Sequence, residues 1–102
     1  MLVELSIVPA GGDSHLSARI AEALKIVDAS GLPYQLTPSG TCVEGEWDEV
    51  MPVIRLCHDR VRGLSSHVFT TIRIEDEEGE RHKLTRNVSS VEEIAGRSLR
   101  KS

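Results

Sequence analysis

The side chains that most often carry catalysis are few in this chain, and their spacing does not assemble an active site. The four histidines stand in no sequence context that marks a general base. His58 follows Cys57 directly, but adjacent residues of a helix point apart, so these two do not form a nucleophile and its base. No nucleophile elbow occurs. The sequence therefore predicts a protein that is not an enzyme.

Metal and cofactor motifs are also missing from the sequence. The two cysteines, Cys42 and Cys57, are too far apart for a zinc motif or a C-x-x-C redox pair, so we expect two free thiols. The acidic residues 75–80 lack EF-hand spacing, and a solvated loop is the simpler interpretation. Gly11-Gly12 lacks Walker spacing. We expect no metal and no cofactor.

Charge and hydropathy limit the partners. The formal net charge is −4 at pH 7, and no aromatic residues interleave with basic ones, so nucleic acid is not expected as a partner. No segment approaches the roughly 20 apolar residues of a membrane span, and the N-terminus shows no basic start followed by a long apolar run. We expect a cytoplasmic protein without membrane contact.

Alternating and paired short apolar segments predict the strands. Period-2 alternation indicates strands at residues 3–8 and 66–75, each with one buried face. Residues 34–37 and 41–44 flank Pro38-Ser39-Gly40, which predicts a β-hairpin.

Helical spacing of apolar residues predicts three helices. The first follows Gly12, with Asp13 or Ser14 as its N-cap, and ends at Gly31. The second contains residues 50–61 and closes at Gly63. Residues 90–93 read as a capping box, so we expect a third, short helix to begin there and to contain Val91, Ile94, Ala95 and Leu99.

The order strand, helix, strand, strand, helix, strand is the ferredoxin-like pattern. We expect an α+β fold, βαββαβ, with an antiparallel sheet, both long helices on one face, and an additional C-terminal helix. The length of 102 residues suits one domain, residues 1–102. The sheet face away from the helices would carry Glu4, Ser6, Val8, His67, Phe69, Thr71 and Arg73.

That mixed face and the scarcity of aromatic residues, 3% of the chain, suggest a partner subunit. We therefore expect an oligomer.

The hairpin region carries a resemblance to a known family. Gly40-Thr41 and Glu44-Gly45 match the Gly-Thr and Glu-Gly of the thiamine-binding-protein family, and residues 70–74 and Ser90-Val91 agree with it as well. The resemblance extends over nearly the whole chain. It implies reversible, non-catalytic binding of thiamine or its hydroxymethylpyrimidine moiety by a dimer or a dimer of dimers.

The residues are compatible with such a ligand. A carboxylate such as Glu44 can accept from the exocyclic amino group of an aminopyrimidine, and the hydroxyls of Thr37, Thr41 or Ser6 can donate to its ring nitrogens. Thr41 and Glu44 fall on opposite faces of one strand, so one of them must reach the site from a strand end or a subunit interface.

Simpler interpretations stay open. Glu44 can be an exposed strand-end carboxylate, and the two threonines can serve only the turn. Trp47 can fill a subunit or helix–sheet contact. The chain also has Arg86-Asn87 where the family often has Gly-Lys, a difference that bears on ligand or assembly. The alternative function is a structural or regulatory interaction protein whose uncovered sheet face serves only oligomerisation.

Overall fold

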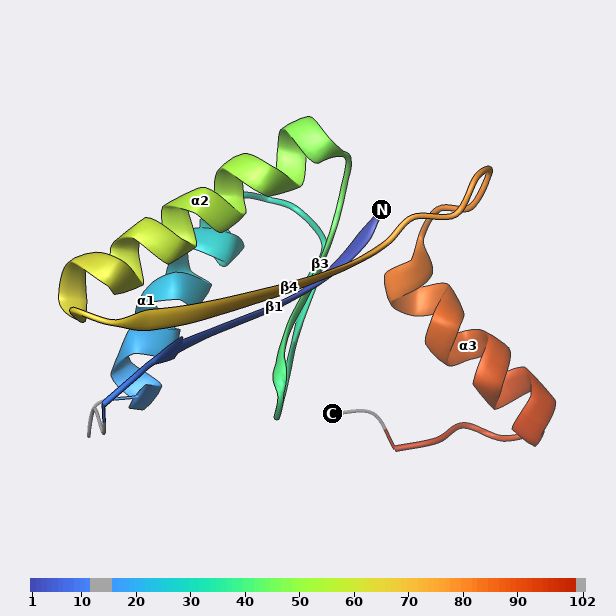
Figure 1. Ribbon diagram of the computed structural model, residues 1–102. Coiled ribbons are helices and arrows are strands. Elements are labelled where there is room, and N and C mark those ends of the chain that lie inside the picture. Colours follow the sequence, from blue (N-terminus) through green and yellow to red (C-terminus); the bar gives the residue numbers. More distant parts are fainter. Residues whose placement is uncertain (12–15, 101–102) are drawn as a thin grey trace.

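The computed structural model describes residues 1–11 and 16–100. Strand β1 (Leu2–Pro9) is followed by helix α1 (Leu16–Ala29), the hairpin of β2 (Tyr34–Thr37) and β3 (Gly40–Glu44), helix α2 (Trp47–Leu64), β4 (Val68–Glu75) and α3 (Lys83–Ala95). The strands form one antiparallel sheet in the order β2-β3-β1-β4. This confirms the predicted ferredoxin-like fold with an additional C-terminal helix (Figure 1).

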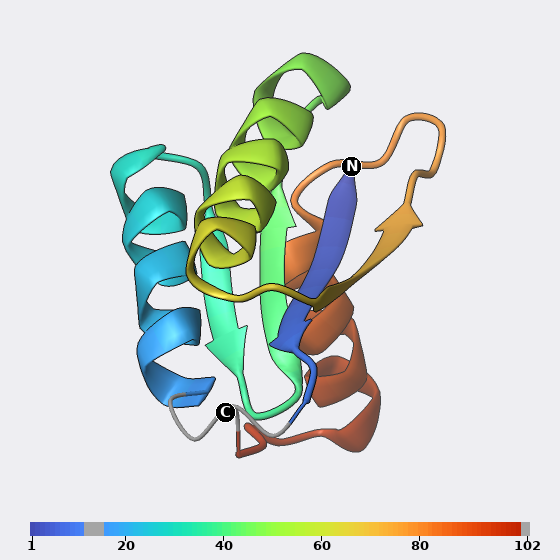
Figure 2. The same cartoon turned by 60° about the vertical axis from the view of Figure 1, so that its left-hand side comes forward.

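One face of the sheet carries the core. Val3, Leu5 and Ile7 of β1 are buried beneath α1 and α2, as the period-2 pattern predicted. The two helices lie on the same side of the sheet (Figure 2). The core is built from small aliphatic side chains and a thiol: Met1, Val3, Leu5, Ile7, Ala23, Val27, Val43, Val50, Ile54, Cys57 and Val61.

The opposite face, here called the open face, consists of the alternate residues of the same strands. The register aligns Ser6 with Thr71 and Glu4 with Arg73, so opposed residues project on one side, as expected. The open face comprises Leu2, Glu4, Ser6, Val8, Cys42, Glu44, Phe69, Thr71, Arg73 and Glu75. Phe69 is 60% exposed and Val8 is 42% exposed there.

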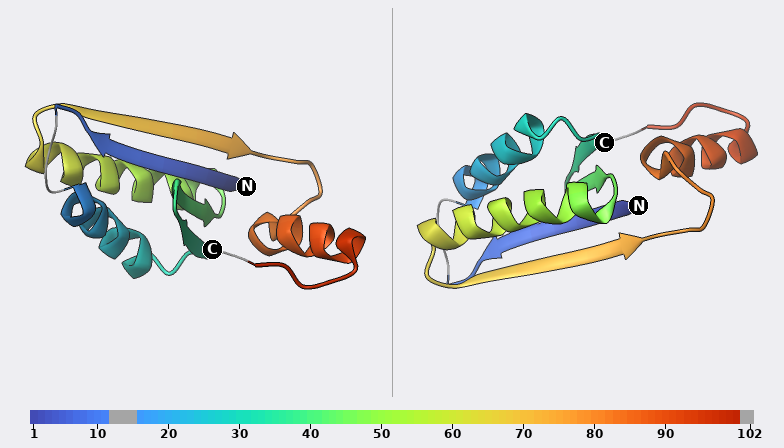
Figure 3. Two further views of the ribbon diagram at one scale, coloured as in Figure 1. Left: turned by 90° about the horizontal axis from the view of Figure 1, so that it is seen from below. Right: turned by 90° about the horizontal axis from the view of Figure 1, so that it is seen from above.

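Helix α3 stands over one end of the open face, away from α1 and α2 (Figures 1 and 3). Polar contacts hold it there. The Leu84 N–H donates to Glu44 Oε2 at 3.4 Å, and Lys83 Nζ lies 3.4 Å from Glu75 Oε1. None of its residues is buried, and Ile94 is 90% exposed.

The start predicted for α3 is wrong. The helix begins at Lys83, so Ser90 lies inside it, and Leu99 lies beyond its end at Ala95. A capping box requires extended backbone at the serine, but the apolar spacing continues back through Val88 and Leu84 and keeps this segment helical. The helix ends where Gly96 takes a positive φ of 73°.

The other boundaries differ little from the prediction. Helix α2 passes Gly63 and ends at Leu64. Gly31 follows α1 with a φ of 77°, the left-handed conformation expected after a helix. The predicted N-cap of α1, Asp13 or Ser14, lies outside the described residues.

Candidate functional site

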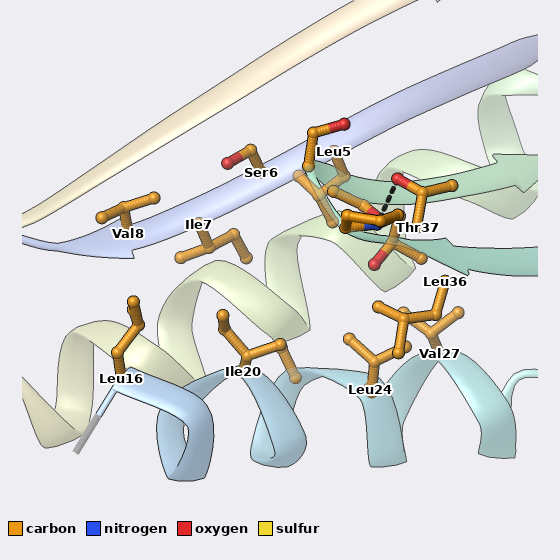
Figure 4. A pocket seen from close by; sticks show the side chains of 15 residues that line it. Leu5, Ser6, Ile7, Val8, Leu16, Ile20, Leu24, Val27, Leu36 and Thr37 are labelled. Atoms are coloured by element: carbon orange, nitrogen blue, oxygen red, sulfur yellow. Dashed lines mark hydrogen bonds between the residues drawn. The ribbon is translucent and has the colours of Figure 1, made fainter. Parts of the chain in front are cut away.

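A cavity of about 260 Å³ lies between β1, the β2–β3 hairpin and α1, and we call it the hairpin pocket. Residues 5–8 of β1 and 36–41 of the hairpin form its sheet side. Leu16, Ile20, Ala23, Leu24 and Val27 of α1 form the helix side. The side chains of Leu16, Ile20 and Leu24 point from α1 towards the strands (Figure 4). None of the described lining residues is ionisable.

The sheet opens here because its strands differ in length. Pairing of β3 with β1 ends at Leu5 opposite Thr41, whereas β1 continues to Pro9 against β4. The hairpin turn therefore leaves the second half of β1 without a neighbour on that side. The apolar residues of α1 cover the resulting gap.

Three of the four predicted site residues lie at the hairpin pocket. Thr41 is buried on the helix side of β3, and its hydroxyl makes no hydrogen bond within the described residues. The Thr37 hydroxyl donates to the carbonyl oxygen of Gly40 at 2.9 Å. Thr37 thus stabilises the turn, in agreement with its simpler interpretation, and its oxygen can still accept a hydrogen bond from a group in the pocket.

Ser6 reaches the same pocket from β1. Its side chain projects from the side of the strand opposite to that of Ile7, as does Val8 (Figure 4). Ser6 is half-buried and belongs to the open face, so it contributes to the rim of the pocket.

Glu44 is not brought together with the three hydroxyl residues. It lies at the opposite end of β3 from Gly40, three residues or about 10 Å beyond Thr41. There it faces a separate cavity of about 180 Å³ with Glu46, Glu49, Arg81 and His82. Its carboxylate accepts from the Leu84 N–H at the first turn of α3.

Trp47 and the cysteines lie away from the hairpin pocket. Trp47 is the first residue of α2 and is 51% exposed. Cys57 is buried in the core, whereas Cys42 is half-buried on the open face, and both thiols are free. Burial raises the pKa of both thiols, to about 11 for Cys57, and the nearby Glu4 carboxylate adds to the rise at Cys42. Neither is an activated nucleophile.

Sequence reasoning missed the contribution of α1 to the pocket. Leu16, Ile20 and Leu24 follow the helical spacing of apolar residues, and that pattern does not distinguish a residue of the core from one that lines a pocket. In the structure Leu16 is 41% exposed, and Ile20 and Leu24 are half-buried at the cavity. The sequence signal for this difference is the short β3, which cannot cover the whole of the helix.

The structure also bears on metal binding and on membrane spans. Within residues 1–11 and 16–100, no group of three or more histidine, cysteine or acidic side chains is arranged to hold a metal ion. Nor is any helix in the described part of the chain both long and apolar enough to cross a membrane.

The fold and the pocket define a small ferredoxin-like domain with a cavity at its central hairpin, and the described lining of that cavity is uncharged and mostly aliphatic. The chain belongs to the thiamine-binding protein family, whose model matches residues 3–92.

The UPF0045 protein YqgV of Bacillus subtilis is 33% identical over 96 residues, covering 88% of this chain and 92% of that protein. The UPF0045 protein sll0230 of Synechocystis is 31% identical over 71 residues. This match spans 70% of the present chain and 59% of the Synechocystis protein. A crystal structure from Thermotoga maritima, of a protein provisionally assigned to thiamine biosynthesis or salvage, superposes with a TM-score of 0.79. It is 26% identical, with 88% of this chain and 96% of that chain covered.

Proposed function

We propose that this protein binds thiamine or a related hydroxymethylpyrimidine reversibly, in the hairpin pocket and without catalysis. The observation that carries the proposal is the position of the pocket. It is built on Gly40-Thr41, the motif through which the chain resembles its family, and it combines aliphatic walls with hydroxyl groups. Such a combination suits a flat heterocycle with a few polar atoms.

The size and polarity of the pocket favour the pyrimidine ring over the thiazolium ring. A cavity of about 260 Å³ falls just below the roughly 300–1,000 Å³ of pockets for larger ligands. A cationic thiazolium would gain from a carboxylate, and none of the described residues that line the pocket carries one. The lining hydroxyls of Thr37, Thr41 and Ser39 can hydrogen-bond a neutral ring.

The same polarity supports binding rather than turnover. General acid–base and nucleophilic catalysis need a titratable or activated group within reach of the reacting atoms. The described lining offers hydroxyls and aliphatic groups, with no carboxylate or imidazole beside them to activate a nucleophile.

Self-association is part of the proposal. The open face exposes Phe69 and Val8 beside the polar residues Ser6 and Thr71, and the apolar residues of α3 are exposed above its other end. A dimer or a dimer of dimers would cover this surface. Only a neighbouring copy or a shared interface could bring Glu44 to a ligand in the hairpin pocket. The two free thiols support a cytoplasmic location for the protein.

Thermal unfolding with added ligand tests the proposal. The purified protein is titrated with 4-amino-5-hydroxymethyl-2-methylpyrimidine and, separately, with thiamine. A ligand that binds only the native state stabilises it by about 2.7 kcal/mol at a concentration of 100 Kd. For a domain of this size that is a rise in Tm of roughly 10 °C or more. No rise with either compound up to millimolar concentration contradicts the proposal.

The second candidate is a structural or regulatory interaction protein. The observation in its favour is the 60% exposure of Phe69, because an aromatic side chain on a sheet face is suited to a protein contact. A stable oligomer that shows no thermal shift with either ligand would favour this function over ligand binding.

A further inference from the structure

The free edge of β1 presents backbone groups to the hairpin pocket. In the interior of the sheet, β1 is paired on both sides from Leu2 to Leu5. Beyond Leu5 it is paired only with β4, and the side left by β3 is occupied by the pocket.

Two hydrogen bonds outside the strand ladders fix the direction of every peptide group in β1. The Ala10 N–H donates to the His67 carbonyl at 2.8 Å, on the β4 side. The Gly45 N–H donates to the Met1 carbonyl at 3.1 Å, on the β3 side. In an antiparallel strand the N–H and C=O of one residue point to the same side, and successive residues alternate. The backbone N–H and C=O groups of odd-numbered residues in β1 therefore point towards β3. Those of Ile7, which lies beyond the end of the β1–β3 pairing, point into the gap.

Pro9 agrees with this assignment. It is also odd-numbered, so its nitrogen faces the free edge, where no ladder hydrogen bond is lost by the absence of an N–H. In the described part of the chain, the free edge thus offers the N–H and C=O of Ile7 and the C=O of Pro9, and of these two residues only Ile7 supplies both a donor and an acceptor. The Ile7 side chain projects perpendicular to these groups, on the helix side of the sheet, where it is buried and also lines the pocket.

We propose that the backbone N–H and C=O of Ile7 are the polar recognition element of the hairpin pocket. They select a planar heterocycle with a hydrogen-bond donor and an acceptor adjacent on one edge. A 4-aminopyrimidine has this edge: its amino group would donate to the Ile7 carbonyl, and its ring nitrogen would accept from the Ile7 N–H. The ligand edge then takes the place of the missing residue of β3, as in strand addition to an exposed edge. This inference rests on the proposed function, and it assigns recognition of the ligand's polar edge to the backbone of Ile7.

Aliphatic walls complete the arrangement. Ile20 and Leu24 of α1 and Leu36 of β2 line the same cavity and can hold the faces of a flat ring. Recognition through backbone groups needs no particular side chain, so no sequence motif indicates it.

Amide hydrogen exchange of the full-length, 15N-labelled protein tests the inference. In the free protein the Ile7 amide should exchange at least tenfold faster than the amides of Val3 and Leu5, whose N–H groups are paired with β3. Saturation with 4-amino-5-hydroxymethyl-2-methylpyrimidine should slow Ile7 exchange at least tenfold. The matched analogue 5-hydroxymethyl-2,4-dimethylpyrimidine keeps the shape but lacks the donor. It should bind roughly fivefold more weakly or worse, because the Ile7 carbonyl stays unpaired.

The outcomes separate this inference from the proposed function. Slow exchange of Ile7 in the free protein overturns the inference whatever the ligand does. Binding of the aminopyrimidine by calorimetry, with unchanged exchange at Ile7 or with equal affinity for the dimethyl analogue, also overturns it and leaves the proposed function standing. Fast exchange at Ile7 with no binding of thiamine or either pyrimidine overturns both.

Discussion

A β-carbon added to Gly40 would lie 2.9 Å from the carbonyl oxygen of Leu5. Real β-carbons essentially never come that close to a neighbouring atom, and the neighbour here is backbone in a paired strand, which cannot turn aside. The close approach of β3 to β1 therefore requires glycine at this position. It also ends the β1–β3 pairing at the entrance of the hairpin pocket, so one residue serves both the fold and the site.

Replacing this glycine tests the close approach. Gly40→Ala should lower the free energy of unfolding by roughly 1–3 kcal/mol, the range for forced overpacking. Gly63→Ala is the matched control, because it adds the same methyl group inside α2 with nothing within 4 Å. It should raise stability by about 0.5–1 kcal/mol. Urea unfolding measures both, and a change of the same sign in the two variants contradicts the argument.

The element order of this fold could be predicted because the long strands and the first two helices have clear periods and a turn sequence marks the hairpin. The alternation of Val3, Leu5 and Ile7 reports a half-buried strand, and the register places their neighbours Glu4 and Ser6 on the open face as expected. The start of α3 could not be predicted in this way. A capping box and the middle of an amphipathic helix can share the same letters, and the backbone at Ser90 follows the longer apolar pattern.

The sequence indicates the positions of the candidate site residues only in part, for a related reason. Thr37 and Thr41 could be associated with one pocket because a tight turn keeps its flanking residues together. Glu44 is close in sequence, but a strand carries it about 10 Å away from Thr41. The backbone N–H and C=O of Ile7 could not be identified as binding groups from the sequence, because their exposure depends on where β3 ends.

The Thr41 hydroxyl should contribute to ligand binding and not to folding. Thr41→Val keeps nearly the same shape and removes a hydroxyl that has no partner in the described chain. We expect affinity for the aminopyrimidine to fall about 2- to 10-fold, the value of one neutral hydrogen bond, with stability unchanged or slightly higher. Calorimetry and urea unfolding measure these effects.

Thr37→Val is the contrasting variant for that experiment. It loses the hydrogen bond to the Gly40 carbonyl and should cost about 1 kcal/mol of stability. A Thr41→Val protein that binds as well as the parent would remove Thr41 from the site.

Glu44→Gln distinguishes a ligand carboxylate from a contact that holds α3. If a neighbouring copy brings Glu44 to the ligand, the variant should bind the aminopyrimidine at least tenfold more weakly, because a charged acceptor is worth roughly 1.5–3 kcal/mol. Assembly should be unchanged in light scattering. Unchanged affinity by calorimetry would limit Glu44 to its observed contact with the Leu84 N–H. Loss of the oligomer would make it an interface residue.

Self-association should depend on the open face. The parent protein should show a mass of at least twice the 11.2 kDa of one chain in light scattering at micromolar concentration. Phe69→Lys should shift it towards the single-chain mass, because a charge would be buried in an apolar contact. Leu56→Lys is the matched control: Leu56 is 58% exposed, against 60% for Phe69, but lies on α2. Equal masses for both variants would place the interface elsewhere.

The buried thiol of Cys57 should make stability fall at alkaline pH. Cys57 is fully buried, and its thiol donates to the Ala23 carbonyl at 3.4 Å, linking α2 to α1. Burial raises the pKa of this thiol to about 11, whereas a cysteine in the unfolded chain has a pKa of about 8.5. Between these values the unfolded chain binds fewer protons than the folded one, so the free energy of unfolding falls as pH rises. The contribution is fully present below about pH 8.5.

Cys57→Ala isolates this contribution from the other groups that titrate at alkaline pH. The variant leaves a small cavity and should be less stable than the parent at pH 8, but its stability should fall less steeply between pH 9 and 10.5. One proton is worth about 1.4 kcal/mol per pH unit, which bounds the difference in slope. Cys42→Ala should change the slope less, because Cys42 is only half-buried. Urea unfolding at four or five pH values measures the slopes, and equal slopes for the parent and Cys57→Ala would show that the thiol ionises as readily in the fold as outside it.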